Sequence, residues 1–579
     1  MPSRSGPVHV AKITRKTHGK TYVSYLLRRT FRQGDQVKHE TLGNLSHLPT
    51  AVIDAVRRML RGEVLVGLRD RFRILRARPH GHVAAVLGTL RHLGLEQLLG
   101  SRRSRQRDLV AGMIVGRLLN PGSKLATTRR WSQNTLGESL GVESAEVDEL
   151  YLAMDWLLAR QRRIEIALAK RHLSEGSLVL YDVTSTYFEG RHCALARLGY
   201  SRDDKPGKLQ IVIGLLTNGA GCPVAVEVFE GHTGDPKTLG VQITKVRQRF
   251  GLQRVILVGD RGMITSARIE EDLRPAASID WITALRAPQI QALRERGSLQ
   301  LGLFDERDLA EISDPAYPGE RLIVCRNPWL AAERARKRQE LLADTEMKLA
   351  PIAAATTRVQ RPLRGKARIG LRVGRVLGRS KVGKHFRLEI TEERFSFERD
   401  REGIAQEAAL DGIYVVRTSV PPERLTAEDA VRSYKRLSAV EQAFRSLKTI
   451  ELEIRPIFHR LADRVRAHVF LCMLAYYVEW HMRRALAPLL FDDPQPQLRP
   501  GSPVAPARRS AAAEAKAHRQ RLEDGTPVHS FRTLLEELAT LTKNRLQLKD
   551  AESAEFDELT EPTPLQRRAF ELLGVPINL

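Results

Sequence analysis

The pattern of hydrophobic and polar positions divides the chain into segments of different secondary structure. Residues 1–48 carry short strand-like runs separated by turn signals at His18-Gly19 and Gln33-Gly34. Over residues 49–175, apolar residues recur every three or four positions, which predicts helices. We therefore expect a small β-rich N-terminal segment followed by a helical domain.

From residue 176 onward the pattern predicts a sheet. Five short apolar runs fit strands, and they are LVLYDV, QIVIGLL, PVAVEVF, RVILVGD and WITALR. Asn218-Gly219 predicts a hairpin between the second and third runs, and a helical pattern precedes the fourth. The order β-β-β-α-β is that of an RNase H-like core, in which the first and fourth strands lie side by side. The predicted fold class is α/β, with the first part of this core at residues 176–290.

An interruption of the core is predicted over residues 291–410. It begins with a charged helical pattern, and between Arg358 and Arg387 there are eleven Lys and Arg and no Asp or Glu. Such a charge run is compatible with a disordered tail, but alternating Ile, Leu and Val favour a small sheet with one basic face. The core resumes over residues 411–480 with the buried run GIYVVRTSV and a helix. Residues 481–579 are predicted to be helical, with a flexible Pro- and Ala-rich linker at about 492–520.

The charge balance of the chain points to a polyanionic partner. The chain has 94 Lys and Arg against 68 Asp and Glu, a formal net charge of +26 and a pI near 10.3. A solvated basic surface is the simpler explanation, but an excess of this size is typical of proteins that bind nucleic acid. We expect DNA rather than a membrane or an acidic protein. The clustered arginines of the helical block, Arg102 to Arg107, suit a DNA-end-binding domain.

Cysteine usage and hydropathy indicate the compartment. The four cysteines are far apart in sequence and form no C-x-x-C pair, which argues against a zinc knuckle and against a disulfide framework. No signal peptide is recognisable at the N-terminus. The most apolar run, Val469–Val478, is too short to span a bilayer and predicts a buried helix. We expect a cytoplasmic protein that is associated with the nucleoid when it is bound to DNA.

Three acidic residues stand where a solvated surface acid is unexpected. Asp182 and Asp260 each end an apolar run, and Glu441 lies on the helical stretch YKRLSAVEQAFRSLK. A single buried Asp at a strand end often only caps the following turn. Together, carboxylates from two adjacent strands and one helix could hold two Mg²⁺ or Mn²⁺ ions, which neutralise charge at a phosphodiester during cleavage. No sequence cluster of His and Cys competes for zinc.

The helix around Glu441 provides an independent test of this hypothesis. Its apolar stripe, which must face the core, consists of Leu437, Val440, Phe444 and Leu447. Tyr434, Glu441 and Lys448 follow at intervals of seven and share a second face. This face is either a solvated edge or a metal ligand flanked by contacts to DNA phosphates.

These motifs resemble a known family of enzymes. DVTSTYFEG, GDRGM and the spacing Y-x6-E-x6-K are similar to the catalytic core of bacterial insertion-sequence transposases, in the IS4-related group and its IS1634-like family. The resemblance covers roughly residues 170 to 480. It implies a DDE mechanism on an RNase H-like core, interrupted by a mainly β insertion domain, with Asp182, Asp260 and Glu441 as the catalytic acids and ligands of two Mg²⁺ or Mn²⁺ ions.

The resemblance also implies residues that contact DNA phosphates. Tyr434 and Lys448 occupy two positions of the family's Tyr-Arg-Glu-Lys signature. The signature Arg, four residues before Glu441, is replaced by Leu437, so Arg436 or Arg445 is expected to supply that contact. His232 stands in GHTGD where related sequences often carry Asn, and it has no assigned role.

The implied function is DNA transposition. Such an enzyme binds the terminal inverted repeats of its element, cleaves there and transfers the 3′-OH ends to target DNA, acting as a homodimer or larger assembly. Two alternatives remain open, an RNase H-like nuclease without strand transfer and a catalytically inactive, transposase-derived DNA-binding protein. The run Gly378–Lys384 fits most of a P-loop, but His385 replaces the required Ser or Thr, so no nucleotide cofactor is expected.

Overall fold

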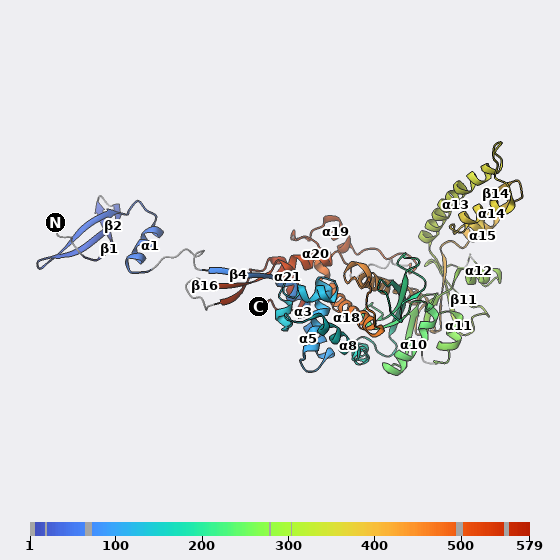
Figure 1. The fold of residues 1–579 in the computed structure, drawn as a ribbon, viewed down its shortest axis with the longest axis horizontal. Coiled ribbons are helices and arrows are strands. Elements are labelled where there is room, and N and C mark those ends of the chain that lie inside the picture. Colours follow the sequence, from blue (N-terminus) through green and yellow to red (C-terminus); the bar gives the residue numbers. More distant parts are fainter. Residues whose placement is uncertain are drawn as a thin grey trace. The chain divides into compact units, whose positions relative to one another are not determined.

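A computed structural model of the chain has a mixed α/β fold. It describes residues 6–17, 20–63, 72–276, 279–300, 302, 304–493, 502–548 and 555–578. The chain forms two compact units, one made of the residues up to Arg78 with Thr542–Thr560, the other of Pro79–Leu541 with Glu561–Asn578. Figure 1 shows the helices and strands of both units, coloured from the N-terminus to the C-terminus.

The smaller unit contains two three-stranded sheets. The first is antiparallel and is followed by one helix, with β1 (Val8–Thr17), β2 (Lys20–Gln33), β3 (Gln36–Asn44) and α1 (Thr50–Leu60). The second has the order β17-β16-β4, with β4 (Phe72–Pro79), β16 (Thr542–Leu548) and β17 (Glu555–Leu559).

The sequence prediction for this unit is partly confirmed. The β-rich start and the turn at Gln33-Gly34 are confirmed, since Gln33 pairs with Gln36 across the hairpin. The predicted turn at His18-Gly19 lies outside the described residues. The strands β4, β16 and β17 were predicted as parts of helical regions, which is wrong. Most residues of β4 are exposed, and its sheet partner comes from the other end of the chain, so no local pattern reveals it.

The larger unit is built around a nine-stranded sheet with the order β11-β12-β15-β10-β9-β5-β7-β6 and β8 on β7. Its strands are β5 (Leu178–Tyr187), β6 (Arg197–Leu198), β7 (Leu209–Asn218), β8 (Pro223–Glu230), β9 (Val255–Gly259), β10 (Ile279–Ala284), β11 (Leu309–Ile312), β12 (Arg321–Arg326) and β15 (Ile413–Thr418). All five predicted runs form strands, and β5 pairs in parallel with β9 as expected. The Asn218 side chain accepts hydrogen bonds from the backbone of Ala220 and Cys222, which fixes the β7–β8 turn.

Helices cover this sheet and share its core. Those of the N-terminal block are α3 (Gly81–His92), α4 (Leu95–Leu99), α5 (Arg105–Leu119), α6 (Lys124–Arg130), α7 (Leu136–Leu140), α8 (Val147–Leu158) and α9 (Gln161–His172). Those of the C-terminal region are α18 (Ala462–Leu486), η6 (Ala487–Leu489), α19 (Ala511–Arg519), α20 (Phe531–Ala539) and α21 (Pro564–Leu573). The short helices between strands are η1 (Asp235–Thr238), α10 (Leu239–Thr244), η2 (Lys245–Arg249), α11 (Ser266–Arg268), η3 (Ile269–Leu273) and α12 (Ala287–Glu295).

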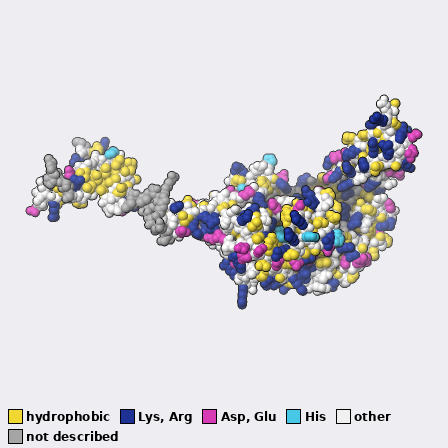
Figure 2. Space-filling model, viewed as in Figure 1, with side chains coloured by type: hydrophobic (Ala, Val, Ile, Leu, Met, Phe, Trp, Pro, Cys, Tyr) yellow, Lys and Arg dark blue, Asp and Glu magenta, His cyan; other side chains and the backbone are white. Residues whose placement is uncertain are grey.

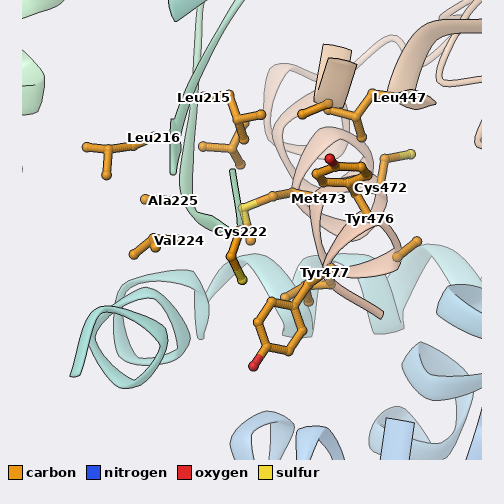
Figure 3. Close-up of a cluster of buried hydrophobic side chains, with 14 of the residues drawn as sticks. Leu215, Leu216, Cys222, Val224, Ala225, Leu447, Cys472, Met473, Tyr476 and Tyr477 are labelled. Atoms are coloured by element: carbon orange, nitrogen blue, oxygen red, sulfur yellow. The ribbon is translucent and has the colours of Figure 1, made fainter. Parts of the chain in front are cut away.

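The central helix α18 joins these layers. It packs against α5 and α8 on one side and against β8 on the other, and its apolar run Val469–Val478 is buried as predicted. Figure 3 shows Cys472, Met473 and Tyr476 of α18 beside residues of the β7–β8 hairpin. One continuous hydrophobic cluster therefore unites the helical block with the sheet, whereas the sequence suggested a separate helical domain. Within the described residues, no helix combines the length and the apolarity needed to cross a bilayer.

The insertion is mainly helical, which contradicts the predicted β domain. It contains α13 (Pro328–Thr356), α14 (Lys366–Leu377), η4 (Gly383–His385), β13 (Phe386–Ile390), β14 (Phe395–Arg399) and α15 (Arg401–Ala408). The run read as a strand is α14. Ile369 and Val373 are buried while Leu371 between them is 60% exposed, so the burial follows the helical period and not alternation.

Part of the predicted flexible linker is structured. Val504 is fully buried, and the Lys435 ammonium donates hydrogen bonds to the carbonyls of Pro503, Val504 and Ala505. The helix α19 then begins at Ser510, whose hydroxyl caps it. Buried residues around Val504, with Lys435 and Asn327 from distant parts of the sequence, hold this segment, and neither contact leaves a signal in a Pro- and Ala-rich composition.

Candidate active site

The three predicted acids lie on three neighbouring elements of the larger unit. Asp182 is on β5, and Asp260 directly follows β9. Because Tyr181 pairs with Gly259, the two aspartates occupy equivalent positions on adjacent parallel strands. Asp182 does not end its strand, as the sequence suggested, because β5 continues to Tyr187 along its other neighbour, β7.

Glu441 is carried by a helix that packs against β5. The predicted continuous helix is interrupted at Arg436, which separates α16 (Ala427–Lys435) from α17 (Leu437–Arg445), and a π-helical turn, η5 (Ser446–Ile450), follows. Tyr434, Glu441 and Lys448 therefore come from three successive segments and not from one face of one helix. The apolar stripe is confirmed, since its four members, Leu437, Val440, Phe444 and Leu447, are buried.

The acids meet in one open pocket of about 800 Å³. Asp182, Asp260 and Glu441 all line it, together with Tyr434 and Lys448. Two other aspartates, Asp203 and Asp235, also line it, so the pocket is rich in carboxylate oxygens. Such a donor set suits hard divalent cations.

Several carboxylates line the pocket, and their negative charges repel one another. Burial raises the pKa of Asp182 to about 7. The hydrogen bond that its carboxylate accepts from the Val183 amide lowers the pKa and so offsets part of this effect. The charges of Asp260 and Glu441 raise that pKa further, while Arg202 lowers it. Without a cation, Asp182 is therefore protonated below neutral pH and only partly ionised near pH 7.

Asp260 is positioned by its own turn and by Tyr434. One carboxylate oxygen accepts a hydrogen bond from the Gly262 amide at 3.1 Å, and the other accepts one from the Tyr434 hydroxyl at 3.4 Å. A Cβ atom at Gly262 would lie 3.2 Å from the Asp260 carboxylate, which accounts for glycine in GDRGM. Burial and Asp260 raise the pKa of Tyr434, so its hydroxyl keeps its proton and donates.

Three ion pairs within the site were not anticipated. Arg202 donates to both oxygens of Asp235, at 2.7 and 2.6 Å. Asp203 is almost fully buried and accepts from Lys448 at 2.8 Å and from Arg455 at 2.6 Å. The signal for the first pair was present in the runs GYSRDD and GHTGD, but nothing local shows that they fold over the same pocket.

The residues predicted to contact DNA phosphates differ in whether they line the pocket and in whether they are already paired. Lys448 is engaged by Asp203 and by the Ser185 carbonyl, and burial lowers its pKa. Arg445 is exposed at the pocket, whereas Arg436 is exposed beside Gly219 and does not line the pocket. His232 is 59% exposed, lies 3.5 Å from a Glu230 oxygen and does not line the pocket either.

A second group of possible metal ligands lies elsewhere in the larger unit. His172, Cys222 and His481 each offer one ligand atom within 4.8 Å of the others, although they are distant in sequence. The prediction that no cluster of His and Cys would compete for a metal is therefore wrong for the folded chain. None of the three lines the acid pocket, so this group is separate from the acidic site. Burial lowers the pKa of His481 to about 4, and His172, Arg484 and Arg171 act in the same direction.

Comparisons with known proteins agree with this geometry. Residues 174–478 match the family described as Transposase DDE domain, and residues 10–65 match the IS1634 family transposase N-terminal domain. No curated protein matches the sequence. Among solved structures, a piggyBac transposase synaptic complex with hairpin DNA is similar with a TM-score of 0.34 and 9% identity, over 79% of this chain and 76% of that chain, a likeness too distant to add to the argument. Since the first match spans more than half of the chain, the chain belongs to the DDE transposases, and its N-terminal match is to their IS1634 family.

Proposed function

We propose that the acidic pocket carries out DNA cleavage and strand transfer at the terminal inverted repeats of the element. Asp182, Asp260 and Glu441 are the proposed ligands of two Mg²⁺ or Mn²⁺ ions. The observation that carries the proposal is the convergence of these three carboxylates in one pocket, with the pKa of Asp182 raised by burial and by the other two acids. Carboxylates that repel one another in this way gain stability from a bound divalent cation.

The fold supports the same assignment. The partial strand order β8-β7-β5-β9-β10, with β5 and β9 parallel, agrees with an RNase H-like core. That order brings the end of β9 level with the middle of β5, and α17 packs over β5. Each acid therefore projects from an element that the core holds in position, which limits how far the acids can move relative to one another.

The protein residues of the pocket have distinct proposed roles. The ions, when bound, would supply an activated nucleophile and neutralise charge on the attacking and leaving oxygens. Tyr434 orients Asp260 through its hydroxyl, and the pair of Lys448 and Arg455 fixes Asp203 in the wall. Arg445 is exposed at the pocket and is free to bind a DNA phosphate next to the scissile one.

The DNA outside the pocket is proposed to bind mainly through its phosphates. The insertion presents a basic face on α14, where Arg368, Arg372 and Arg375 are exposed at helical spacing, and Arg379, just after the helix, is the fourth exposed arginine. Figure 2 shows Lys and Arg side chains crowded on this domain. None of the four makes an ion pair within the described part of the chain. Joining two element ends requires two active sites, so we propose a homodimer or larger assembly acting on cytoplasmic DNA.

The test is a cleavage and joining assay with DNA that carries the ends of the element. The wild-type chain in Mg²⁺ is expected to cut at the ends and to join pre-cleaved ends to a target plasmid. Asp182→Asn is expected to lower both rates by at least about 10³-fold while leaving DNA binding intact. Asp463→Asn, a change at a surface acid of α18, is the matched control and should retain activity.

The same assay separates the alternatives. Cutting without joining would identify a nuclease, and binding without metal-dependent cutting would identify an inactive DNA-binding protein. Equal cleavage by the wild type and Asp182→Asn would show that Asp182 holds no essential metal ion.

A further inference from the structure

A second pocket in the larger unit is lined by cations and has no role so far. It has a volume of about 560 Å³ and is formed by α6, α8, the start of α18 and the segment 453–461. Its basic lining residues are Arg117, Lys124, Arg455, Arg460 and Arg464, with His459 and His468. Among the lining residues, Glu453 is the acid, and its side chain is exposed.

Lys124 is the unusual member of this set. It is only 4% exposed, and within the described residues its ammonium makes no hydrogen bond and no ion pair. Burial lowers its pKa to about 7, and the nearby Arg117 lowers it further. The Cys472 thiol is close by, but burial raises its pKa and keeps it neutral, so it supplies no counter-charge. A lysine buried this deeply is costly to charge unless an anion pairs with it.

The neighbours of Lys124 are also short of acceptors. Arg117 is buried and donates to the Gly122 carbonyl at 3.1 Å, with no carboxylate beside it in the described structure. His468 donates a hydrogen bond through Nε2 to the Ile454 carbonyl, while its buried Nδ1 has no partner among the described residues. Burial and the charges of Lys124 and Arg117 depress the pKa values of both His459 and His468. The pocket therefore offers the donors of Lys124 and Arg117 to an anion, and within the described residues no carboxylate forms an ion pair with either.

The position and the rim of the pocket indicate which anion fits. Arg455 lines both this pocket and the acidic pocket, so the two adjoin. Phe458 and Leu461, which are 62% and 57% exposed, form an apolar rim. A free phosphate would fill little of the volume, whereas a nucleotide could place its phosphate at Lys124 and its sugar and base against Phe458.

We propose that this pocket binds a backbone phosphate of the DNA strand held at the active site, with Lys124 and Arg117 as its principal ligands. The pocket would thereby hold the strand a short distance from the bond that is cut. The choice of DNA as the source of the phosphate rests on the proposed function, whereas the phosphate site itself does not.

The experiment measures the melting temperature of the full-length chain in EDTA, so that no cleavage occurs. Inorganic phosphate and a hexathymidylate oligonucleotide are titrated separately at constant ionic strength, with chloride as the balancing anion. Both are expected to raise the melting temperature of the wild type in a saturable manner. Lys124→Met should weaken the apparent affinity for both by about 10-fold or more, because a charged hydrogen bond to the anion is lost.

Controls exclude a general effect of salt and a loss of folding. Lys337→Met, at an exposed lysine of α13, should behave as the wild type. Lys124→Met should melt no lower than the wild type in phosphate-free buffer, since it removes an unpaired buried charge. Should that variant fail to fold, Arg464→Gln at the edge of the pocket is expected to weaken both ligands by a smaller factor.

Two results would overturn the proposal. Unchanged phosphate and oligonucleotide affinities in Lys124→Met and in Arg464→Gln would exclude the pocket as a phosphate site. Stabilisation by inorganic phosphate alone would assign the pocket to a free anion and remove DNA as its ligand. Neither result depends on cleavage, so the proposed catalytic function would still be tested independently by the joining assay.

Discussion

At the scale of single residues, Asp182 gives the clearest link between stability and function. Its pKa rises from 3.8 to about 7 in the folded chain, so the folded state binds the proton more tightly than the unfolded state does. For such a group, the free energy of unfolding falls as the pH rises from about 4 to about 7, and the loss is complete above that range. The acid that the chemistry needs therefore destabilises the metal-free fold.

Because ionised Asp182 destabilises the metal-free fold, replacing it with a neutral residue should stabilise that fold. In EDTA at pH 8, Asp182→Asn should raise the free energy of unfolding by about 2 kcal/mol, a value discounted for residual solvent access. At pH 3 the difference should be close to zero, because Asp182 is then mostly protonated in both the folded and the unfolded chain. Denaturant unfolding at both values measures this, and a variant less stable than the wild type at pH 8 would contradict it.

The missing signature Arg gives a second prediction at this scale. Arg445 lines the acidic pocket and Arg436 does not. Arg445→Ala should therefore lower the cleavage rate by about 10- to 100-fold, through the loss of one charge-assisted phosphate contact. Arg436→Ala is the matched variant and should remain within a few-fold of the wild type. The opposite ranking would move the phosphate contact to Arg436.

At the scale of elements, the sequence predicted what depends on local pattern. The strands β5 and β9 were predictable because each is an apolar run that stops at or near an acid, and the stripe on α17 was predictable from its spacing. The strand β4 was not, because its residues are mostly exposed and its partner β16 lies far away in sequence. The helix α14 was misread because Ile369, Leu371 and Val373 also alternate, although only the first and third are buried.

The candidate site could likewise be predicted from the sequence only in part. Two acids on neighbouring strands could be brought together from strand order alone. The buried cluster of Asp203, Lys448 and Arg455 depends on a loop after β6, a π-helical turn and a segment before α18, which only tertiary structure brings together. The same is true of Lys124, whose burial beneath the segment 453–461 leaves no mark in its own surroundings in the sequence.

The basic face of α14 provides a test at this scale. Replacing Arg368, Arg372 and Arg375 by Gln should weaken binding to DNA of any sequence and reduce the slope of log K against log salt by about 2 to 3, near 0.9 per phosphate contact. Titrations between 50 and 200 mM salt measure the slope. The matched control removes exposed charges of α13 at Arg334 and Lys337, where the slope should hardly change. An unaltered slope in the α14 variant would exclude this face from the DNA path.

At the scale of the whole molecule, shared packing links the active site to the surrounding helices. The helix α18 packs against β8, α5 and α8, and its first turn borders the cationic pocket. The chain has a net charge of +26, but the pocket at the nine-stranded sheet is lined by several acids. We expect the basic surface to hold the DNA and the acidic pocket to admit metal ions between the carboxylates and the phosphate.

The most direct test of the central claim is a metal-specificity switch at Asp182. Asp182→Cys replaces an oxygen ligand by sulfur, which binds Mg²⁺ poorly and Mn²⁺ better. Cleavage of element-end DNA by this variant should be lost in Mg²⁺, by at least about 10³-fold, and recover by about 10-fold or more in Mn²⁺. Cleavage at the wild-type rate in Mg²⁺, or a loss that Mn²⁺ does not relieve, would contradict the assignment of Asp182 as a metal ligand.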